Sequence, residues 1–212
     1  MPVSAKICGL STTATIDAAL AGGASHVGFV FFPRSPRNLS FDQAAAIAAR
    51  VPNHVARVGV FVDPDDQTIA RAVHAGRLSA VQLHQTAPAR VAHLRHQIGI
   101  ETWAAVAIKV RADLDQAPDY VGAADRLLFD AKTPADAALP GGMGVRFDWS
   151  LMDGFRPPLP WALSGGLDAA NVAEAVARTG ATLVDTSSGV EDAPGVKSVD
   201  KIAAFLQSVR QL

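Results

Sequence analysis

The chain has 212 residues, 49% of them hydrophobic, which is enough for one globular domain, residues 1–212, with a substantial apolar core. A formal net charge of -1 gives no electrostatic basis for binding nucleic acid or an anionic membrane. One cysteine excludes an internal disulfide and a cysteine-rich metal site, and the sequence shows neither a signal peptide nor a membrane-spanning apolar stretch, so we expect a reduced, cytoplasmic protein.

Short runs rich in β-branched residues alternate with alanine-rich helical segments along the whole chain. The predicted strands are 4–8, 27–31, 56–61, 80–83, 102–107, 127–130, 161–163 and 183–185. The predicted helices are 14–21, 42–50, 67–75, 89–97, 113–117, 150–154, 171–178 and 198–209, with Asp168 and Ser198 at N-cap positions. Eight such units predict a compact (β/α)₈ TIM barrel. An open doubly wound sheet is the alternative, but it usually has fewer strands, and no Gly-x-Gly-x-x-Gly follows the first strand.

Alternation of side chains across each strand predicts an apolar face against the helices and a polar face inside the barrel. The polar faces carry Lys6, Cys8, Arg57, Gln82, Asp130 and Asp185. We interpret Lys6, Arg57 and Gln82 as structurally paired groups, because buried charges persist mainly when paired. Cys8, Asp130 and Asp185 instead lie at the C-terminal ends of their strands, where barrel enzymes carry catalytic groups. A lone cysteine is more often a buried hydrophobic residue, so Cys8 alone does not establish chemistry.

Glycines and serines follow the last two predicted strands, and this pattern is typical of a phosphate site in a (β/α)₈ barrel. The first loop contains Gly165 and Gly166, and the second contains Ser187, Ser188 and Gly189. Glycines let backbone amides approach a ligand, and serines add hydroxyl donors. A third glycine cluster, at 141–144, either reaches over the same side or is only a loop.

Two arginines stand in a loop after the second predicted strand, in which Pro33 and Pro36 restrict the backbone. One interpretation is that this brace holds Arg34 and Arg37 ready for an anion, since the guanidinium fork suits a planar carboxylate. Loop arginines are ordinarily solvated, so the residue types alone leave both interpretations open.

Together these motifs resemble the phosphoribosylanthranilate isomerase family of tryptophan biosynthesis. The resemblance runs along the whole chain and is carried by the segments Lys6-Ile7-Cys8-Gly9-Leu10, Gly28-Phe29-Val30-Phe31-Phe32-Pro33-Arg34-Ser35-Pro36-Arg37, Val58-Gly59-Val60-Phe61-Val62, Val81-Gln82-Leu83-His84, Leu128-Phe129-Asp130, Phe147-Asp148-Trp149, Leu163-Ser164-Gly165-Gly166-Leu167 and Asp185-Thr186-Ser187-Ser188-Gly189-Val190-Glu191. It implies a barrel enzyme without cofactor or metal, acting on a phosphorylated small molecule, as a monomer or a homodimer.

The resemblance also implies roles for single residues. Cys8 matches the general base, Asp130 the general acid and Arg37 the group that holds the substrate carboxylate. Asp185 matches an active-site aspartate whose role is open, and the phosphate loops match at Gly165, Gly166, Ser187, Ser188 and Gly189. The acid requires a raised pKa, and the base requires a pKa lowered by a cation, for which Lys6 is the candidate.

The sequence departs from the family pattern at Gln85, where glycine is common, at Met143, and in the long stretch 133–140.

Two other functions compete with the isomerase interpretation. A dual-specificity sugar isomerase of histidine and tryptophan synthesis would use an aspartate as base on the first strand, so Cys8 argues against it. A non-catalytic barrel that senses a phosphorylated metabolite would need no acid–base pair.

Overall fold

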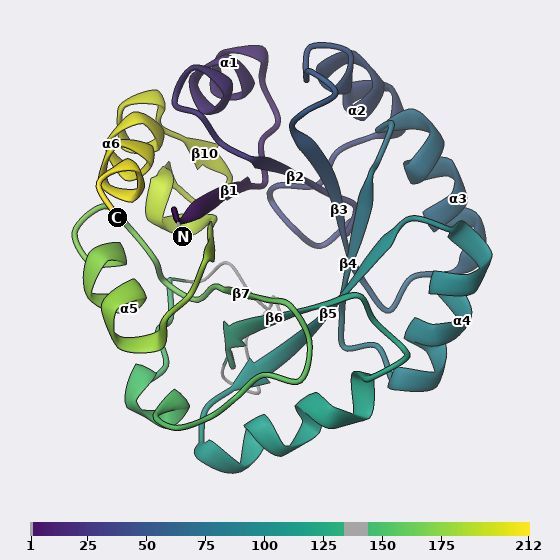
Figure 1. Cartoon of the computed structure of the whole chain (residues 1–212). Helices are drawn as coiled ribbons and strands as arrows, with labels where there is room; N and C mark the ends of the chain where they lie inside the picture. Colours follow the sequence, from purple (N-terminus) through teal and green to yellow (C-terminus); the bar gives the residue numbers. More distant parts are fainter. Residues whose placement is uncertain (1, 134–143) are drawn as a thin grey trace.

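Eight parallel strands form a closed barrel with helices around it, which confirms the predicted fold (Figure 1). The computed structural model describes residues 2–133 and 144–212. Neighbouring strands pair in chain order, and β1 closes the barrel by pairing with β8. The barrel strands are β1 (Ser4–Cys8), β2 (His26–Val30), β3 (Ala56–Val62), β4 (Ala80–His84), β5 (Glu101–Ile108), β6 (Arg126–Ala131), β7 (Trp161–Leu163) and β8 (Leu183–Thr186).

The α-helices form a ring outside the strands, and several begin at residues whose side chains cap them. They are α1 (Thr13–Ala21), α2 (Phe41–Ala48), α3 (Asp66–Ala75), α4 (Pro88–Ile98), α5 (Val172–Thr179) and α6 (Val199–Arg210). Ser40 and Gln43 form a capping box at α2, and Asp65 caps α3 by accepting from the amide of Thr68.

The structure differs from the predicted helices in three places. The segments predicted as helices at 113–117 and 150–154 are the 3₁₀ helices η1 (Arg111–Tyr120) and η2 (Trp149–Met152), and Pro118 stands inside the first. Asp168 does not cap α5, because its carboxylate accepts from the amides of Ala170 and Asn171 in a turn before the helix. Ser198 does occupy the N-cap position of α6, but without a side-chain cap hydrogen bond.

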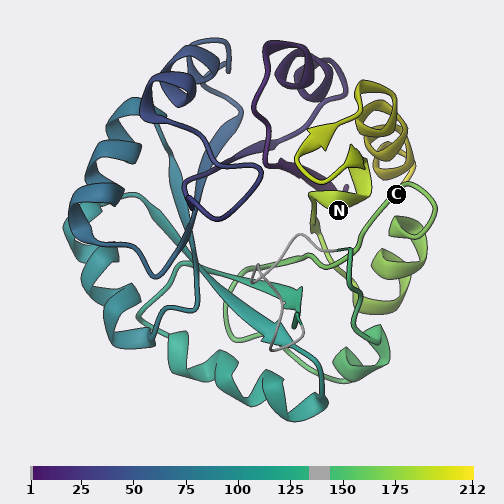
Figure 2. The same ribbon diagram turned by 180° about the vertical axis from the view of Figure 1, so that it is seen from behind.

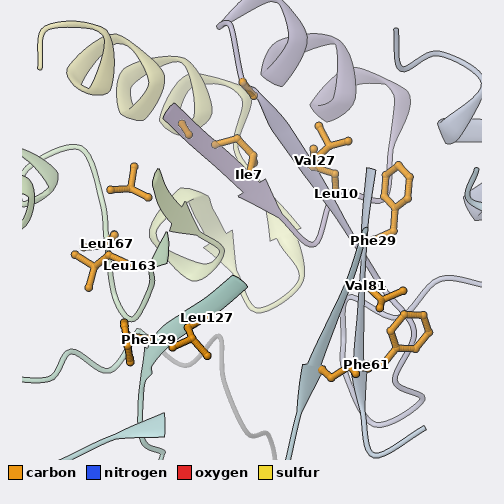
Figure 3. Packing of buried hydrophobic residues seen from close by; sticks show 14 of the residues in the cluster. Ile7, Leu10, Val27, Phe29, Phe61, Val81, Leu127, Phe129, Leu163 and Leu167 are labelled. Atoms are coloured by element: carbon orange, nitrogen blue, oxygen red, sulfur yellow. The ribbon is translucent and has the colours of Figure 1, made fainter. Parts of the chain in front are cut away.

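The main apolar core lies between the strands and the helices. Figure 3 shows part of this shell, including Ile7 on β1, Phe29 on β2 and Phe61 on β3, all of them fully buried. Alternation along each strand then directs the intervening side chains into the barrel. On β3 these are Val58, which packs with Trp103, and Val60, which packs with Cys8 and Val30.

This arrangement corrects the predicted orientation of Arg57. Its guanidinium does not enter the barrel but donates to the carbonyls of Arg77 and Val51, and so joins β3 to the segments around it. The valines of β3 face inward instead, which reverses the predicted polarity of that strand. Backbone carbonyls satisfy an arginine as well as a carboxylate does, so a charged residue type does not by itself show which face of a strand its side chain occupies.

A short hairpin, absent from the sequence prediction, follows β8 and the 3₁₀ helix η3 (Ser188–Val190). Its strands, β9 (Glu191–Ala193) and β10 (Val196–Lys197), pair antiparallel. Figures 1 and 2 show the hairpin beside β1, and the chain ends on α6 close to its beginning. Among the described residues, none of the helices is long and apolar enough to cross a bilayer.

Candidate active site

Polar side chains from most of the barrel converge on one end, around a hollow of about 550 Å³. Five of the predicted site residues line it: Cys8, Arg37, Asp130, Asp185 and Ser187. A second hollow of about 310 Å³ shares Asp130, Asp185 and Ser187, and adds Gly165, Gly166 and Ser188. The apolar lining of the larger hollow is formed by Val30, Phe32, Val60 and Val62. The end therefore offers a polar and an apolar surface side by side.

Lys6 and Asp185 form an ion pair inside the barrel, directly below this end. The Lys6 ammonium donates to Oδ1 of Asp185 over 2.9 Å, and Lys6 is fully buried. The two residues are register partners in the β1–β8 ladder, so barrel closure itself brings them together. The second oxygen of Asp185 accepts from the hydroxyl of Ser164 over 3.4 Å. The ion pair therefore places one positive and one negative charge close enough to Cys8 and Asp130 to change their pKa values.

Asp130 has the properties of an acid that is protonated near neutral pH. Burial, and then the negative charge of Asp185, raise its pKa from 3.8 to about 7, and a hydrogen bond from the amide of Ala131 only partly offsets them. The raised pKa agrees with what a general acid requires. Asp185 thus acts on Asp130 through charge.

Cys8 departs from the expectation that a cation lowers its pKa. The thiol is 6% exposed, and burial raises its pKa above the ordinary value, although the charge of Lys6 acts in the opposite direction. Asp185, which pairs with Lys6, adds to the increase. The thiol is therefore the main form at neutral pH, and the thiolate, when formed, is a stronger base than an ordinary cysteine.

Arg37 is buried rather than solvated, and its fork already holds a carboxylate of the protein. Its Nε and one terminal nitrogen each donate to Glu191 over 2.7 Å. Ser35 supports the loop by accepting from the amide of Arg37, whereas Arg34 is exposed. Gly9 leaves room for the arginine, since a β-carbon there would lie 2.7 Å from Cδ of Arg37. The proline-braced loop thus delivers Arg37, and not Arg34, to the site.

The two glycine-containing loops pack closely on each other and on β6. Gly165 has φ 95, and a β-carbon there would lie 2.8 Å from the amide nitrogen of Ala131, next to Asp130. Gly189 lines neither hollow; a β-carbon there would lie 2.0 Å from the carbonyl oxygen of Leu167. Its part is to let the loop after β8 lie against the loop after β7.

Several residues of this end were missed or left without a role by the sequence. Glu191 is the last residue of the family-like segment that begins at Asp185, but the sequence analysis assigned it no role. No motif marks Lys197, and only its charge could have drawn attention to it. His84 lines the larger hollow, and burial lowers its pKa to about 4, so it is neutral and accepts from the amide nitrogen of Gln82 over 2.8 Å.

The departures from the family pattern have different outcomes. Gln85 has φ 52, a left-handed conformation that glycine adopts without strain, which explains why glycine suits this position. Met143 and residues 134–140 lie outside the described part of the chain, as does most of the cluster 141–144. Gly144 is described and lines the smaller hollow.

A barrel end that combines a protonatable carboxyl, a buried thiol, an arginine and glycine-containing loops defines a (β/α)₈ enzyme with acid–base chemistry. The family model for N-(5′-phosphoribosyl)anthranilate (PRA) isomerase matches residues 5–208. The chain belongs to this family.

Relatives and solved structures agree with that assignment. The chain is 54% identical over 214 residues to N-(5′-phosphoribosyl)anthranilate isomerase of Zymomonas mobilis subsp. pomaceae, and 50% identical over 211 residues to that of Paramagnetospirillum magneticum, covering 100% and 98% of them. The structure of the Thermotoga maritima enzyme superposes with a TM-score of 0.86 at 35% identity, covering 99% of this chain and 100% of the other. A further isomerase structure, 33% identical with a TM-score of 0.83 over the same shares, contains reduced 1-(o-carboxyphenylamino)-1-deoxyribulose 5-phosphate.

Proposed function

We propose that the polar end of the barrel is where this chain converts N-(5′-phosphoribosyl)anthranilate to 1-(2-carboxyphenylamino)-1-deoxyribulose 5-phosphate, a step of tryptophan biosynthesis. Asp130 is the general acid of this Amadori rearrangement and Cys8 is the general base. The conversion is an internal isomerisation of an aminoaldose to an aminoketose, so one acid and one base suffice.

The two groups act in sequence. Asp130 donates its proton to the ribose ring oxygen, the bond from that oxygen to C1′ breaks, and the nitrogen lone pair completes an iminium. The Cys8 thiolate then removes the C2′ proton, and the electrons of that C–H bond neutralise the iminium to give an enolamine. Tautomerisation to the ketone places a proton on C1′, so no external oxidant or reductant takes part.

The observation that carries this proposal is the environment of Asp130. A carboxyl whose pKa lies at about 7 keeps its proton in about half of the molecules at neutral pH, where an ordinary aspartate is almost fully ionised, and the same hollow presents a thiol whose ionised form is a strong base. Binding groups flank the pair: Arg37 takes the substrate carboxylate, while the loops with Gly165, Gly166, Ser187, Ser188 and Gly189 take the phosphate. Asp185 sets the charge around the acid and lines both hollows. A cytoplasmic location belongs to the same proposal, because a thiol base must stay reduced.

Turnover of N-(5′-phosphoribosyl)anthranilate by the purified chain, in buffer with a chelator, tests the proposal. We expect stoichiometric formation of the ketose product. The competing function, a barrel that only senses a phosphorylated metabolite, predicts tight binding of the product without turnover.

A further inference from the structure

Arg37 lies against a carboxylate that belongs to the protein, in the site proposed for a substrate carboxylate. Two of its nitrogens donate to the two oxygens of Glu191, at 2.7 Å each, and both side chains are 5% exposed. An arginine and a glutamate so paired carry no net charge, and a neutral pair attracts an incoming anion far less than a lone guanidinium does.

Lys197 changes this balance. Its ammonium donates to Oε1 of Glu191 over 2.7 Å, and its side chain is only 1% exposed. Glu191 therefore lies between two buried basic groups. Burial lowers the pKa of Lys197, while the charge of Glu191 and its hydrogen bond oppose that shift. With Lys197 as an ammonium, the cluster of Arg37, Glu191 and Lys197 carries one net positive charge. Burial raises the pKa of Glu191, but the hydrogen bond from Arg37 and the charge of Lys197 more than reverse this, so the carboxylate stays ionised.

We propose that Lys197 is a positioning residue for substrate binding, which neutralises Glu191 and thereby gives the Arg37 site its net positive charge. This inference rests on the proposed role of Arg37 in holding the substrate carboxylate. Glu191 fixes the direction of the guanidinium fork, and Lys197 offsets the electrostatic cost of doing so. Glu191 and Lys197 lie at the two ends of the β9–β10 hairpin, so this hairpin provides both the carboxylate and the ammonium.

The hairpin is also fixed against the loop of Arg37. Gly195, in its turn, has φ 82, and a β-carbon there would lie 2.7 Å from the carbonyl oxygen of Pro36. The amide of Gly195 donates to Oε2 of Glu191 over 3.3 Å. The hairpin thus holds Glu191 at a fixed distance from the arginine loop.

A competing role for Lys197 is mechanical. The same ammonium donates to the carbonyl of Ser187 over 2.8 Å and lies 3.2 Å from its hydroxyl, so it also braces the loop proposed for the phosphate. A brace alone would affect every phosphorylated ligand equally. A charge supplied to the Arg37 site would affect only ligands that carry the carboxylate.

Two ligands separate these roles: reduced 1-(o-carboxyphenylamino)-1-deoxyribulose 5-phosphate and its counterpart without the carboxylate. The ratio of their dissociation constants, measured by titration calorimetry, is the carboxylate preference, from which the phosphate contribution cancels. Lys197→Met should lower this preference roughly tenfold or more, because it removes one buried charge near the site. Lys197→Gln, which keeps a donor for Ser187 and Glu191, should lower it similarly, and Lys197→Arg should restore it.

Lys201→Met is the matched control. Lys201 donates to the carbonyl of Glu191 on the same hairpin, but its side chain is 49% exposed and pairs with Asp192, so its loss should leave the preference unchanged. Equal weakening of both ligands by Lys197→Met and Lys197→Gln would overturn the inference and leave only the brace. Arg37→Ala shows whether the inference about Lys197 or the proposed role of Arg37 has failed. If Arg37→Ala also weakens the binding of both ligands equally, Arg37 does not bind the substrate carboxylate.

Discussion

Gly28 lies directly opposite Cys8 in the β1–β2 ladder, and the Cys8 thiol fills the space that a side chain at Gly28 would need. A β-carbon at Gly28 would stand 2.9 Å from the sulfur and 3.0 Å from Cα of Cys8. The carbonyl of Gly28 also accepts from the amides of Gly9 and Leu10, where the chain leaves β1. One glycine thus sets both the direction of the thiol and the path of the chain after it.

Gly28→Ala should therefore lower kcat by at least tenfold and lower the free energy of unfolding by about 1–3 kcal/mol, the usual cost of overpacking. The reason is that the thiol and β1 must both move away from the new methyl group. Steady-state kinetics and urea unfolding measure the two effects. Gly59→Ala on β3 is a suitable control, since its methyl would meet Leu78 and Phe61 on the helix side, and it should reduce stability while kcat changes little.

Cys8→Ser should lower kcat roughly 10²–10⁴-fold, the usual contribution of a proton-transfer group. A serine hydroxyl is nearly the size of the thiol but a much weaker acid, so an ionised base is almost never present. Single-turnover kinetics and product-analogue titration check this, and analogue affinity should be close to that of the wild type. Wild-type-like turnover would falsify the assignment of Cys8 as base.

Asp130→Asn should abolish most turnover while leaving the affinity for the product analogue within a few-fold. The amide keeps the shape of the carboxyl and still accepts from the amide of Ala131, but it has no proton to give to the ring oxygen. Parallel kinetic and calorimetric measurements separate the two effects. Loss of affinity instead of turnover would make Asp130 a binding group, and Asp185 would become the next candidate for the acid.

The dependence of kcat/KM on pH should have an unusual form, because the acid has the lower pKa of the pair. The active form has Asp130 protonated and Cys8 ionised. Below the Asp130 pKa of about 7, each pH unit increases the thiolate fraction tenfold; above it, the loss of protonated Asp130 cancels that gain until the raised pKa of Cys8 is reached. We expect a rise, a break near pH 7 and then a plateau. A rise that continues from pH 7 to 9 would show that the protonated carboxyl is not required.

Asp130 should also make the folded protein less stable as pH rises. Between pH about 4 and 7 the folded chain keeps a proton on Asp130 that the unfolded chain has lost, so the free energy of unfolding falls across this window. Asp130→Asn removes the effect, and its stability relative to the wild type should increase by about 2–3 kcal/mol between pH 5 and pH 8. Chemical denaturation at both pH values measures the difference; an equal offset at the two pH values would contradict the raised pKa.

Much of the fold was predictable because its signals are local. Strand and turn patterns repeat along the chain, and each barrel strand was predicted to within about one residue of its bounds. The convergence of Cys8, Asp130 and Asp185 followed from topology, since the carboxyl ends of parallel strands meet at the same end of a barrel. The glycine loops after β7 and β8 followed from the same rule.

The features that escaped prediction depend on long-range charge and burial. The pairing of Arg37 with Glu191 joins residues 154 positions apart, and no local pattern indicates it. The pKa of Cys8 was expected to fall. Burial raises it by more than the charge of Lys6 lowers it, and Asp185, the ion-pair partner of Lys6, opposes the effect of that charge. Arg57 was assigned to the wrong face because backbone carbonyls, which the side-chain pattern does not show, satisfy its guanidinium.

The closure of the barrel has a consequence for the order in which the protein becomes active. Lys6 and Asp185 are 179 positions apart, and Arg37 reaches its carboxylate only once the β9–β10 hairpin exists. A nascent chain emerging from the ribosome therefore carries Asp130 and the arginine loop long before it carries Asp185, Glu191 and Lys197, whose charges act on them. The strand β8 and the β9–β10 hairpin complete a site whose thiol stands on β1, so the site can form only after these later segments have been synthesised.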